Sequence, residues 1–241
     1  MSIKEYLRDL VAHTHDLGCF EAVKIVGTES VTEVSSVAGD RSIVLSAVFK
    51  KPVKEFEGTF GMPNLAKLKV ILSIPEYQRD AAITISKKND SPVNMHFANA
   101  NKDFQNDYRF MSQEIVNERL KTIKFKGVSW DIECQPSLSA IERFKFQARA
   151  HSEQTTFQTK VVNNNLVFCF GDQSNHAGEF VFENNVKGTL KRGWSWPVKG
   201  IQSILDLGGD KTLKISDAGA CEITVDSGIA EYTYILPAIT T

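Results

Sequence analysis

Histidine is the side chain of this 241-residue protein best suited to acid–base or metal chemistry, and the sequence contains five. His13 and His15 are two residues apart, which on a helix turns their rings to different faces, so they do not form a metal-binding pair. His151 and His176 have no cysteine or carboxylate at the spacing typical of zinc ligands. We interpret these histidines as surface or core residues and expect no metal site.

The sequence also lacks the motifs that mark common catalytic sites, namely GxSxG, HExxH, GxxxxGK(S/T) and GxGxxG. Its four cysteines form no CxxC pair, and Cys169 falls within an expected strand. This pattern predicts a buried free thiol and a reducing, intracellular compartment. We therefore expect a protein without catalytic activity and without a cofactor.

Lys191 and Arg192 precede Trp194 and Trp196, a combination that can stack on single-stranded nucleic acid. The alternative is a strand on which one tryptophan ring lies inside the protein and the other lies on its surface. The alternative is the commoner arrangement for a Trp-x-Trp pair, so these residues do not by themselves indicate a binding site.

Charge is nearly balanced, with 28 basic and 29 acidic residues, but a locally positive surface remains compatible with this total. Basic side chains recur on four expected helices, away from their apolar residues. Such a face attracts phosphate, although it is also the ordinary solvated face of a surface helix. Acidic neighbours dilute the charge, namely Glu5, Asp9, Glu142 and Asp206. The basic residues are Lys4, Arg8, Lys67, Lys69, Arg143, Lys145, Arg149 and Lys199.

Two of these helices are expected to begin with a capping box. The first spans residues 2–17, in which Ser2 and Glu5 would cap the start and Gly18 would end the helix. The other begins at Ser139, with Glu142 as its partner, and continues to about residue 151.

The remaining two helices belong to a repeat, in segments 61–72 and 196–207. They are expected to start at Pro63 and Pro197, because proline is tolerated in a first helical turn. Each is followed by alternating apolar and polar residues with period two, which predicts strands. The order helix, strands, helix, strands therefore occurs twice.

Most of the remaining sequence also alternates with period two, and we expect about sixteen or more short, mostly antiparallel strands. Strands that meet without long helical crossovers exclude a doubly wound nucleotide-binding sheet. The predicted fold class is α+β, with two similar domains that each pack two helices on antiparallel sheets.

The domain boundaries expected from the repeat are 1–111 and 127–241, with an interdomain linker at 112–126. Two small domains suit a chain of this length. Residues 121–125 of this segment could already alternate as a strand, and a short exposed helix is the alternative for the segment. No apolar run approaches the roughly 20 residues needed to cross a bilayer, so we expect no membrane association.

Particular stretches of the sequence resemble a known family. Asp107-Tyr108-Arg109-Phe110-Met111 resembles the last strand of the first domain of a DNA sliding clamp. Residues 217–225, followed by 230–238, resemble the C-terminal hairpin and tail of many clamps. With the repeated element order, the resemblance covers nearly the whole chain. It is to the two-domain, PCNA-like clamps of T4-type bacteriophages, archaea and eukaryotes, and the many asparagines favour a phage.

The resemblance implies a homotrimeric ring that encircles duplex DNA and tethers the replicative DNA polymerase for processive synthesis. It also implies loading by an ATP-dependent clamp loader and a cytoplasmic location, in the infected host cell for a phage protein. Phosphate contacts carry no sequence information and permit sliding, so the basic helix faces would line the ring. The eight basic helix residues are accordingly the DNA-binding residues that we expect.

Two further sites follow from the resemblance alone. In the family, clients insert a hydrophobic peptide between the domain linker and the C-terminal tail; completion of the last strand is an alternative role for this tail. Rings close by pairing of strand edges, here near 104–110 and 178–183. The pocket residues would be Ile115, Val116, Leu120, Leu236, Pro237 and Ile239, and the interface residues Phe104, Tyr108, Phe110, Phe180 and Phe182.

Two rival functions are compatible with the same sequence. One is a monomeric processivity factor of the same fold, which would hold DNA on a basic face. The other, from a different class, is a β-rich virion structural protein such as a tail or baseplate component. The assembly state separates the first rival from a ring.

Overall fold

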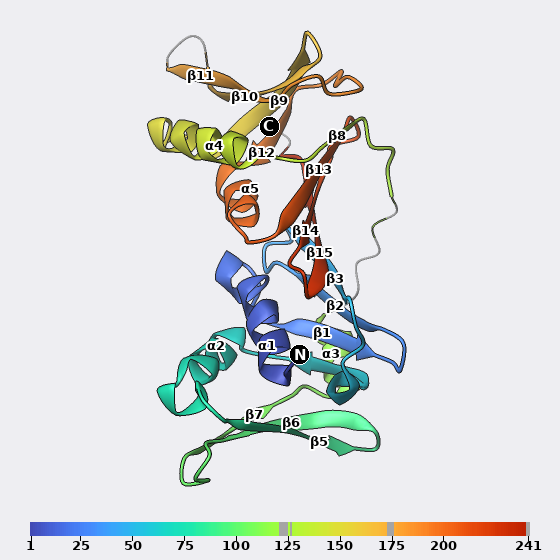
Figure 1. Ribbon diagram of the computed structural model, residues 1–241. Coiled ribbons are helices and arrows are strands. Elements are labelled where there is room, and N and C mark those ends of the chain that lie inside the picture. The colour runs from blue at the N-terminus through green and yellow to red at the C-terminus, as the bar shows by residue number, and fades with distance from the viewer. Residues whose placement is uncertain (121–124, 126, 173–175, 240–241) are drawn as a thin grey trace. The chain divides into compact units, whose positions relative to one another are not determined.

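The computed structural model describes residues 1–120, 125, 127–172 and 176–239, and these residues form two compact units (Figure 1). Unit 1 comprises Met1–Lys124 and Ser227–Tyr232, and unit 2 comprises Phe125–Asp226 and Thr233–Thr241. The residues 227–232 therefore belong to the unit that contains the N-terminus.

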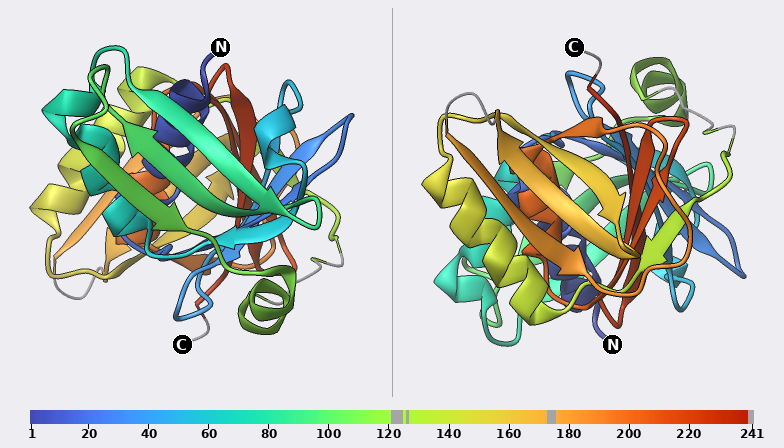
Figure 2. Two further views of the ribbon diagram at one scale, coloured as in Figure 1. Left: turned by 90° about the horizontal axis from the view of Figure 1, so that it is seen from below. Right: turned by 90° about the horizontal axis from the view of Figure 1, so that it is seen from above.

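Unit 1 has the expected order of helix, strands, helix and strands. Its strands form two antiparallel sheets, with the orders β4-β1-β2-β3 and β5-β6-β7 (Figure 2, left). The elements are α1 (Ile3–Ala12), the 3-10 helix η1 (His15–Leu17), β1 (Val23–Gly27), β2 (Thr32–Val37), β3 (Val44–Phe49), η2 (Lys54–Phe56), β4 (Gly58–Met62), α2 (Leu65–Ser73), η3 (Pro75–Tyr77), β5 (Ala82–Lys88), β6 (Ser91–Ala98), β7 (Gln105–Arg109) and α3 (Gln113–Arg119).

The capping box predicted at the start of α1 is confirmed. The Ser2 hydroxyl accepts from the backbone N–H of Glu5, and the Glu5 carboxylate accepts from the backbone N–H of Ser2. The Glu5 carboxylate accepts from the Ser2 backbone N–H and also from the Ser2 hydroxyl, and these two hydrogen bonds lower the pKa of Glu5. The helix ends earlier than expected, at Ala12, and the chain continues through η1 to Gly18, which has a left-handed φ of 76°.

The predicted start of α2 at Pro63 is wrong. The helix begins at Leu65, and Asn64 occupies the cap position with its side-chain oxygen accepting from the N–H of Lys67. The side-chain oxygen of asparagine accepts a hydrogen bond from a backbone N–H in the first helical turn, which a proline side chain cannot do. The capping residue Asn64 therefore determines where the helix starts.

Asp9 joins α1 to residues 227–232 inside unit 1. Its carboxylate accepts from the hydroxyl of Tyr232 at 2.8 Å and from that of Ser227 at 3.0 Å. His13 contributes a ring nitrogen 3.4 Å from the same carboxylate, and its ring stacks on Tyr232 at 4.4 Å. The sequence analysis expected Asp9 to reduce the positive charge on the exposed face of α1. Its side chain is only 9% exposed and lies away from that face, so this expectation is wrong.

Residues 113–119, within the expected linker, form the helix α3. In α3, Val116 is fully buried against Gly61 of β4. A Cβ on Gly61 would lie 2.7 Å from Val116 Cγ2, so only glycine permits this close contact. Residues 121–124 and 126 of the expected linker lie outside the described part of the chain.

Unit 2 repeats the order of helix, strands, helix and strands after one short strand. Its antiparallel sheets have the orders β11-β10-β9-β12 and β15-β14-β13-β8, and α4 lies along the first of them (Figure 2, right). The elements are β8 (Ile132–Cys134), α4 (Leu138–Ala150), β9 (Thr156–Val162), β10 (Asn165–Gly171), β11 (Ala177–Glu183), β12 (Trp194–Pro197), α5 (Val198–Leu205), β13 (Asp210–Ser216), β14 (Ala220–Asp226) and β15 (Ala230–Pro237), of which the first part is counted with unit 1.

Both helices of unit 2 begin differently from the prediction. Ser137, rather than Ser139, caps α4 through a hydrogen bond from the N–H of Ala140. Pro197 is the residue before α5 rather than part of its first turn. In the described residues there are five α-helices and fifteen strands, against the four helices and about sixteen strands expected.

The core of unit 2 is a cluster of phenylalanines between α4 and its sheet. Phe168 lies at its centre, with ring centroids 4.1 Å from Phe182 and 4.7 Å from Phe157. Phe144 supplies the helix side of the same cluster. Cys169 lies on the opposite face of β10 and is half-buried, so the predicted buried thiol is wrong at this position.

None of the helices in the described residues is both long and apolar enough to cross a membrane.

Candidate nucleic-acid interface

The four basic side chains expected on the helices of unit 1 lie in different environments. Lys4 donates to the carbonyl of Tyr77, and its partial burial, followed by the charge of Arg8, lowers its pKa. Arg8 is exposed and donates to the side-chain oxygen of Gln78. These contacts tie α1 to the segment after α2.

On α2, the two lysines differ in their ion pairing. Lys69 forms an ion pair with Asp16 at 2.8 Å. Lys67 is exposed and makes no ion pair with a described residue. Lys67 is therefore the cation of this helix that is free to meet a phosphate.

Among the basic residues expected on α4, two are engaged within unit 2. Lys145 lies 2.5 Å from Asp206 and 2.9 Å from Glu142, and its hydrogen bonds to Asp206 and then to Glu142 raise its pKa. Arg143 donates to the carbonyl of Val181 at 3.1 Å and lies 5.3 Å from the ring centre of Phe180. Both Arg143 contacts direct its guanidinium toward β11.

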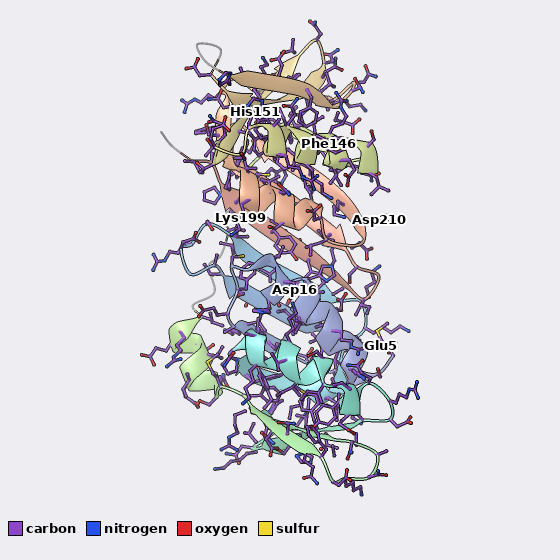
Figure 3. All side chains as sticks on the ribbon, turned by 90° about the vertical axis from the view of Figure 1, so that its left-hand side faces the viewer. Glu5, Asp16, Phe146, His151, Lys199 and Asp210 are labelled. Carbon is purple, nitrogen blue, oxygen red and sulfur yellow. The ribbon has the colours of Figure 1, made fainter. Side chains whose placement is uncertain are left out.

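The other two basic residues expected on helices of unit 2 lie in the last turn of α4 and the first turn of α5. Arg149 and Lys199 are both exposed, and neither forms an ion pair with a residue in the described ranges. The outward face of α4 also carries Phe146, which is 60% exposed (Figure 3). Leu138, the first residue of the helix, is 81% exposed. The sequence interpretation missed both residues. Phe146 lies on the side of the helix opposite Ile141 and Phe144, a position that the helical spacing would have revealed.

The strands expected at subunit edges are edge strands of their own sheets. In the described residues, β7 has β6 as its one neighbour and β11 has β10 as its one neighbour. The rings assigned to the interface lie mostly inside the units: Tyr108, Phe180 and Phe182 are 3–7% exposed, whereas Phe104 is 41% exposed. Phe110 packs on Phe60, with ring centroids 4.7 Å apart. Any pairing between copies would therefore depend on the backbone edges and not on these rings.

The residues expected to receive a client peptide divide into buried and exposed groups within each unit. In unit 1, Val116 is fully buried, Leu120 is half-buried and Ile115 is 44% exposed. In unit 2, Leu236 is fully buried, whereas Pro237 and Ile239 are exposed. The side chains available for docking are thus Ile115 in one unit and Pro237 and Ile239 in the other.

The Trp-x-Trp pair has the arrangement of one ring inside and one nearer the surface. Trp196 is 1% exposed and donates its indole N–H to the hydroxyl of Thr159 at 2.9 Å. Trp194 is half-buried, and the guanidinium of Arg192 lies 5.7 Å from its ring centre. The described residues contain no group of three or more side chains suited to a metal ion.

The fold of the whole chain matches that of known DNA sliding clamps. A PCNA from Thermococcus kodakaraensis superposes with a TM-score of 0.70 at 10% identity, covering 99% of this chain and 98% of that one. A structure described as the C-terminal region of FEN-1 bound to A. fulgidus PCNA gives a TM-score of 0.71 at 11% identity, with coverages of 99% and 95%. The protein therefore has the DNA sliding-clamp fold.

The comparisons of sequence alone found no such likeness. No protein-family model matches the chain, and no curated protein matches its sequence significantly. At 10–11% identity the structural likeness defines the fold, and the functional residues must be argued from this chain itself.

Proposed function

We propose that this protein is a DNA sliding clamp without catalytic activity, which encircles duplex DNA and tethers the replicative DNA polymerase. The observation that carries the proposal is the match of both units, over 95–99% of each chain, to clamps of the PCNA kind. The likeness extends through both units and both of their sheets, as expected for a chain that forms part of a ring.

The exposed cations on the helices support the proposed contact with DNA. Lys67, Arg149 and Lys199 extend from three different helices and are not neutralised by a described carboxylate. Lysine and arginine attract phosphate regardless of base sequence, and such contacts allow a protein to slide. Several weak phosphate contacts from different helices suit a clamp, because a tight or base-specific contact would stop its movement along DNA.

The proposed ring is a homotrimer, closed by pairing of the β7 edge of one copy with the β11 edge of the next. An unpaired edge strand presents a row of backbone N–H and C=O groups, and a closed ring removes this edge from solvent. The partners in this proposal are duplex DNA, the polymerase and an ATP-dependent clamp loader.

Light scattering coupled to size-exclusion chromatography tests the assembly. We expect a mass three times that of the chain, and dilution should convert it directly into monomer, since closure makes all three interfaces equivalent. A monomer at every concentration would contradict the ring and would favour the rival, a monomeric processivity factor that binds DNA on one basic face.

A further inference from the structure

Phe146 is an aromatic side chain that the fold holds at the surface of unit 2. It is 60% exposed, whereas Ile141 and Phe144 form the buried side of the same helix. No aromatic residue in the described part of the chain makes a ring contact with Phe146. Single exposed apolar residues are common on protein surfaces, so exposure alone assigns no role to this ring. Its surroundings distinguish it.

The side chains around Phe146 leave its ring uncovered. On a helix, the residues three and four positions away are the neighbours of a side chain. Towards the start of α4, Glu142 is engaged by Lys145 at 2.9 Å, and a hydrogen bond turns Arg143 toward β11. Towards the end of α4, Ala150 is exposed and has a side chain of one carbon. The flat apolar ring is therefore open to a ligand.

Helices α4 and α5 lie side by side and run in opposite directions (Figure 3). Asp206, at the end of α5, forms an ion pair with Lys145 in the middle of α4 at 2.5 Å. Val198, at the start of α5, donates its N–H to the carbonyl of Thr155, beyond the end of α4, at 3.0 Å. The first turn of α5, which carries Lys199, is therefore placed beside the last turn of α4.

Two exposed cations consequently follow Phe146 along this surface. Arg149 comes three residues after Phe146, a spacing that makes the two side chains neighbours. Lys199 lies beyond it on the first turn of α5. Neither cation forms an ion pair or a side-chain hydrogen bond with a described residue, whereas Lys145 engages both carboxylates of the two helices, Glu142 and Asp206. The surface thus combines an open aromatic ring with a positive side.

We propose that this surface binds single-stranded DNA, with one base stacked on the ring of Phe146 and the adjoining phosphates paired with Arg149 and Lys199. An aromatic ring beside cations is the combination by which proteins hold single strands, since every base has a face that can stack. The inference rests on the proposed function, which brings DNA to these helices. It adds unpaired DNA as a second ligand of the same surface.

A single strand is favoured over duplex DNA by the geometry of stacking. In a duplex the bases already stack on one another, and inserting a side chain between them unstacks and kinks the helix. Such an insertion would hold a clamp at one place. Stacking on an unpaired base has little dependence on sequence, so it is compatible with movement. The template strand ahead of a growing primer end supplies bases of this kind.

Nucleic acid is favoured over a protein partner by the cations that adjoin the ring. Arg149 and Lys199 are two of the three exposed cations assigned to the contact with DNA. A polyanion of high charge density that the clamp already encircles would occupy them ahead of a peptide. A protein partner is therefore an outcome of the test below.

Fluorescence anisotropy on the full chain tests the inference with an oligothymidylate of about 20 nucleotides and a blunt duplex of the same length. Thymines stack weakly on one another, which leaves their faces available. We expect Phe146→Ala to weaken binding of the oligothymidylate about tenfold and to leave binding of the duplex unchanged. Phe146→Trp should retain the affinity, whereas Phe146→Leu, which keeps apolar bulk without an aromatic face, should lose as much as Phe146→Ala.

The tryptophan variant also reports on stacking directly. Phe146→Trp adds an indole at the proposed contact, and its emission should be quenched when the oligothymidylate binds but not when the duplex binds. Absence of quenching at saturating oligothymidylate would overturn the inference.

The matched controls remove other exposed apolar side chains. Leu138→Ala on the same helix and Val70→Ala on α2 should bind both DNAs like the unaltered protein. Full affinity of Phe146→Ala would overturn the inference and would leave the ring to a protein partner. Full affinity of Phe146→Leu, or an equal loss for the single strand and the duplex, would likewise exclude base stacking.

Retention on circular duplex DNA separates this inference from the proposed function. Phe146→Ala should stay on a closed circle as long as the unaltered protein, because encirclement does not require the ring. Failure of the oligothymidylate assay with normal retention would overturn the inference alone. Loss of the unaltered protein from closed circles would contradict the clamp function, whatever the result with single strands.

Discussion

Replacement of Lys67, Arg149 and Lys199 together by glutamate is expected to lower the affinity for duplex DNA roughly a hundredfold at low salt. Unlike Arg8 and Arg143, which donate to Gln78 and Val181, these exposed helix residues have neither an ion pair nor a side-chain hydrogen bond with a described residue. Each phosphate contact contributes about 0.9 to the slope of log affinity against log salt concentration, because bound counterions are released. The triple variant should therefore show both a weaker affinity and a smaller slope.

The measurement is a salt titration of binding to a duplex of fixed length, followed by anisotropy. The matched control reverses Lys51, Lys88 and Lys102, which are exposed residues of unit 1 outside its α-helices, and so makes the same change in net charge. If the control variant lost as much affinity as the helix variant, total charge and not the helix faces would account for binding. An unchanged slope in the helix variant would remove these residues from the interface.

Replacement of Phe168 by alanine is expected to destabilise unit 2 by about 3–5 kcal/mol. Phe168 is 1% exposed, and its ring contacts four other phenylalanines on α4, β9 and β11. The substitution removes buried apolar surface and leaves a cavity that the surrounding rings can fill only in part. A loss of this size is a large fraction of the stability of a domain, so α4 and its cations would lose their support.

Urea titration monitored by circular dichroism measures the change in the free energy of unfolding. Phe146→Ala is the matched control, because Phe146 is 60% exposed on α4 and its loss should change stability by no more than about 0.5 kcal/mol. Similar losses in the two variants would show that the phenylalanine cluster is not the core of this unit.

The order of elements was predictable because apolar periodicity reports directly on burial. In α1, Tyr6, Leu7, Leu10 and Val11 have helical spacing and are buried as a stripe. The starts of helices were less predictable, since several neighbouring residues can cap a helix. Ser137 and Ser139 both offer a hydroxyl near the start of α4, and it is Ser137 that accepts the capping hydrogen bond.

The sequence predicts only in part which basic side chains are engaged by other residues and which are not. Glu142 and Lys145 are three residues apart on one helix, so their ion pair follows from spacing. The second partner of Lys145 is Asp206, which is distant in sequence and is brought close by the packing of α5 beside α4. The turn of Arg143 toward Phe180 likewise depends on tertiary structure, as does the burial of Asp9 beside Tyr232.

The loop before β12 shows a different limit of sequence interpretation. Lys191, Arg192 and Trp194 are adjacent in the sequence and were recognisable as a basic and aromatic group. Their hydrogen bonds to Asp217 connect segments more than twenty residues apart. Hydrogen bonds between such distant segments depend on how the strands pair in the sheet, so no local sequence pattern predicts them.

Retention on circular duplex DNA, compared with the same DNA after linearisation, tests the central claim most directly. The protein is loaded on a closed plasmid, and its release is followed after a single cut by a restriction enzyme. A ring that encircles DNA should remain on the circle and slide off the free ends after the cut, with little dependence on the base sequence. Equal retention on circular and linear DNA would contradict encirclement and would mean that the protein holds DNA by surface contacts alone.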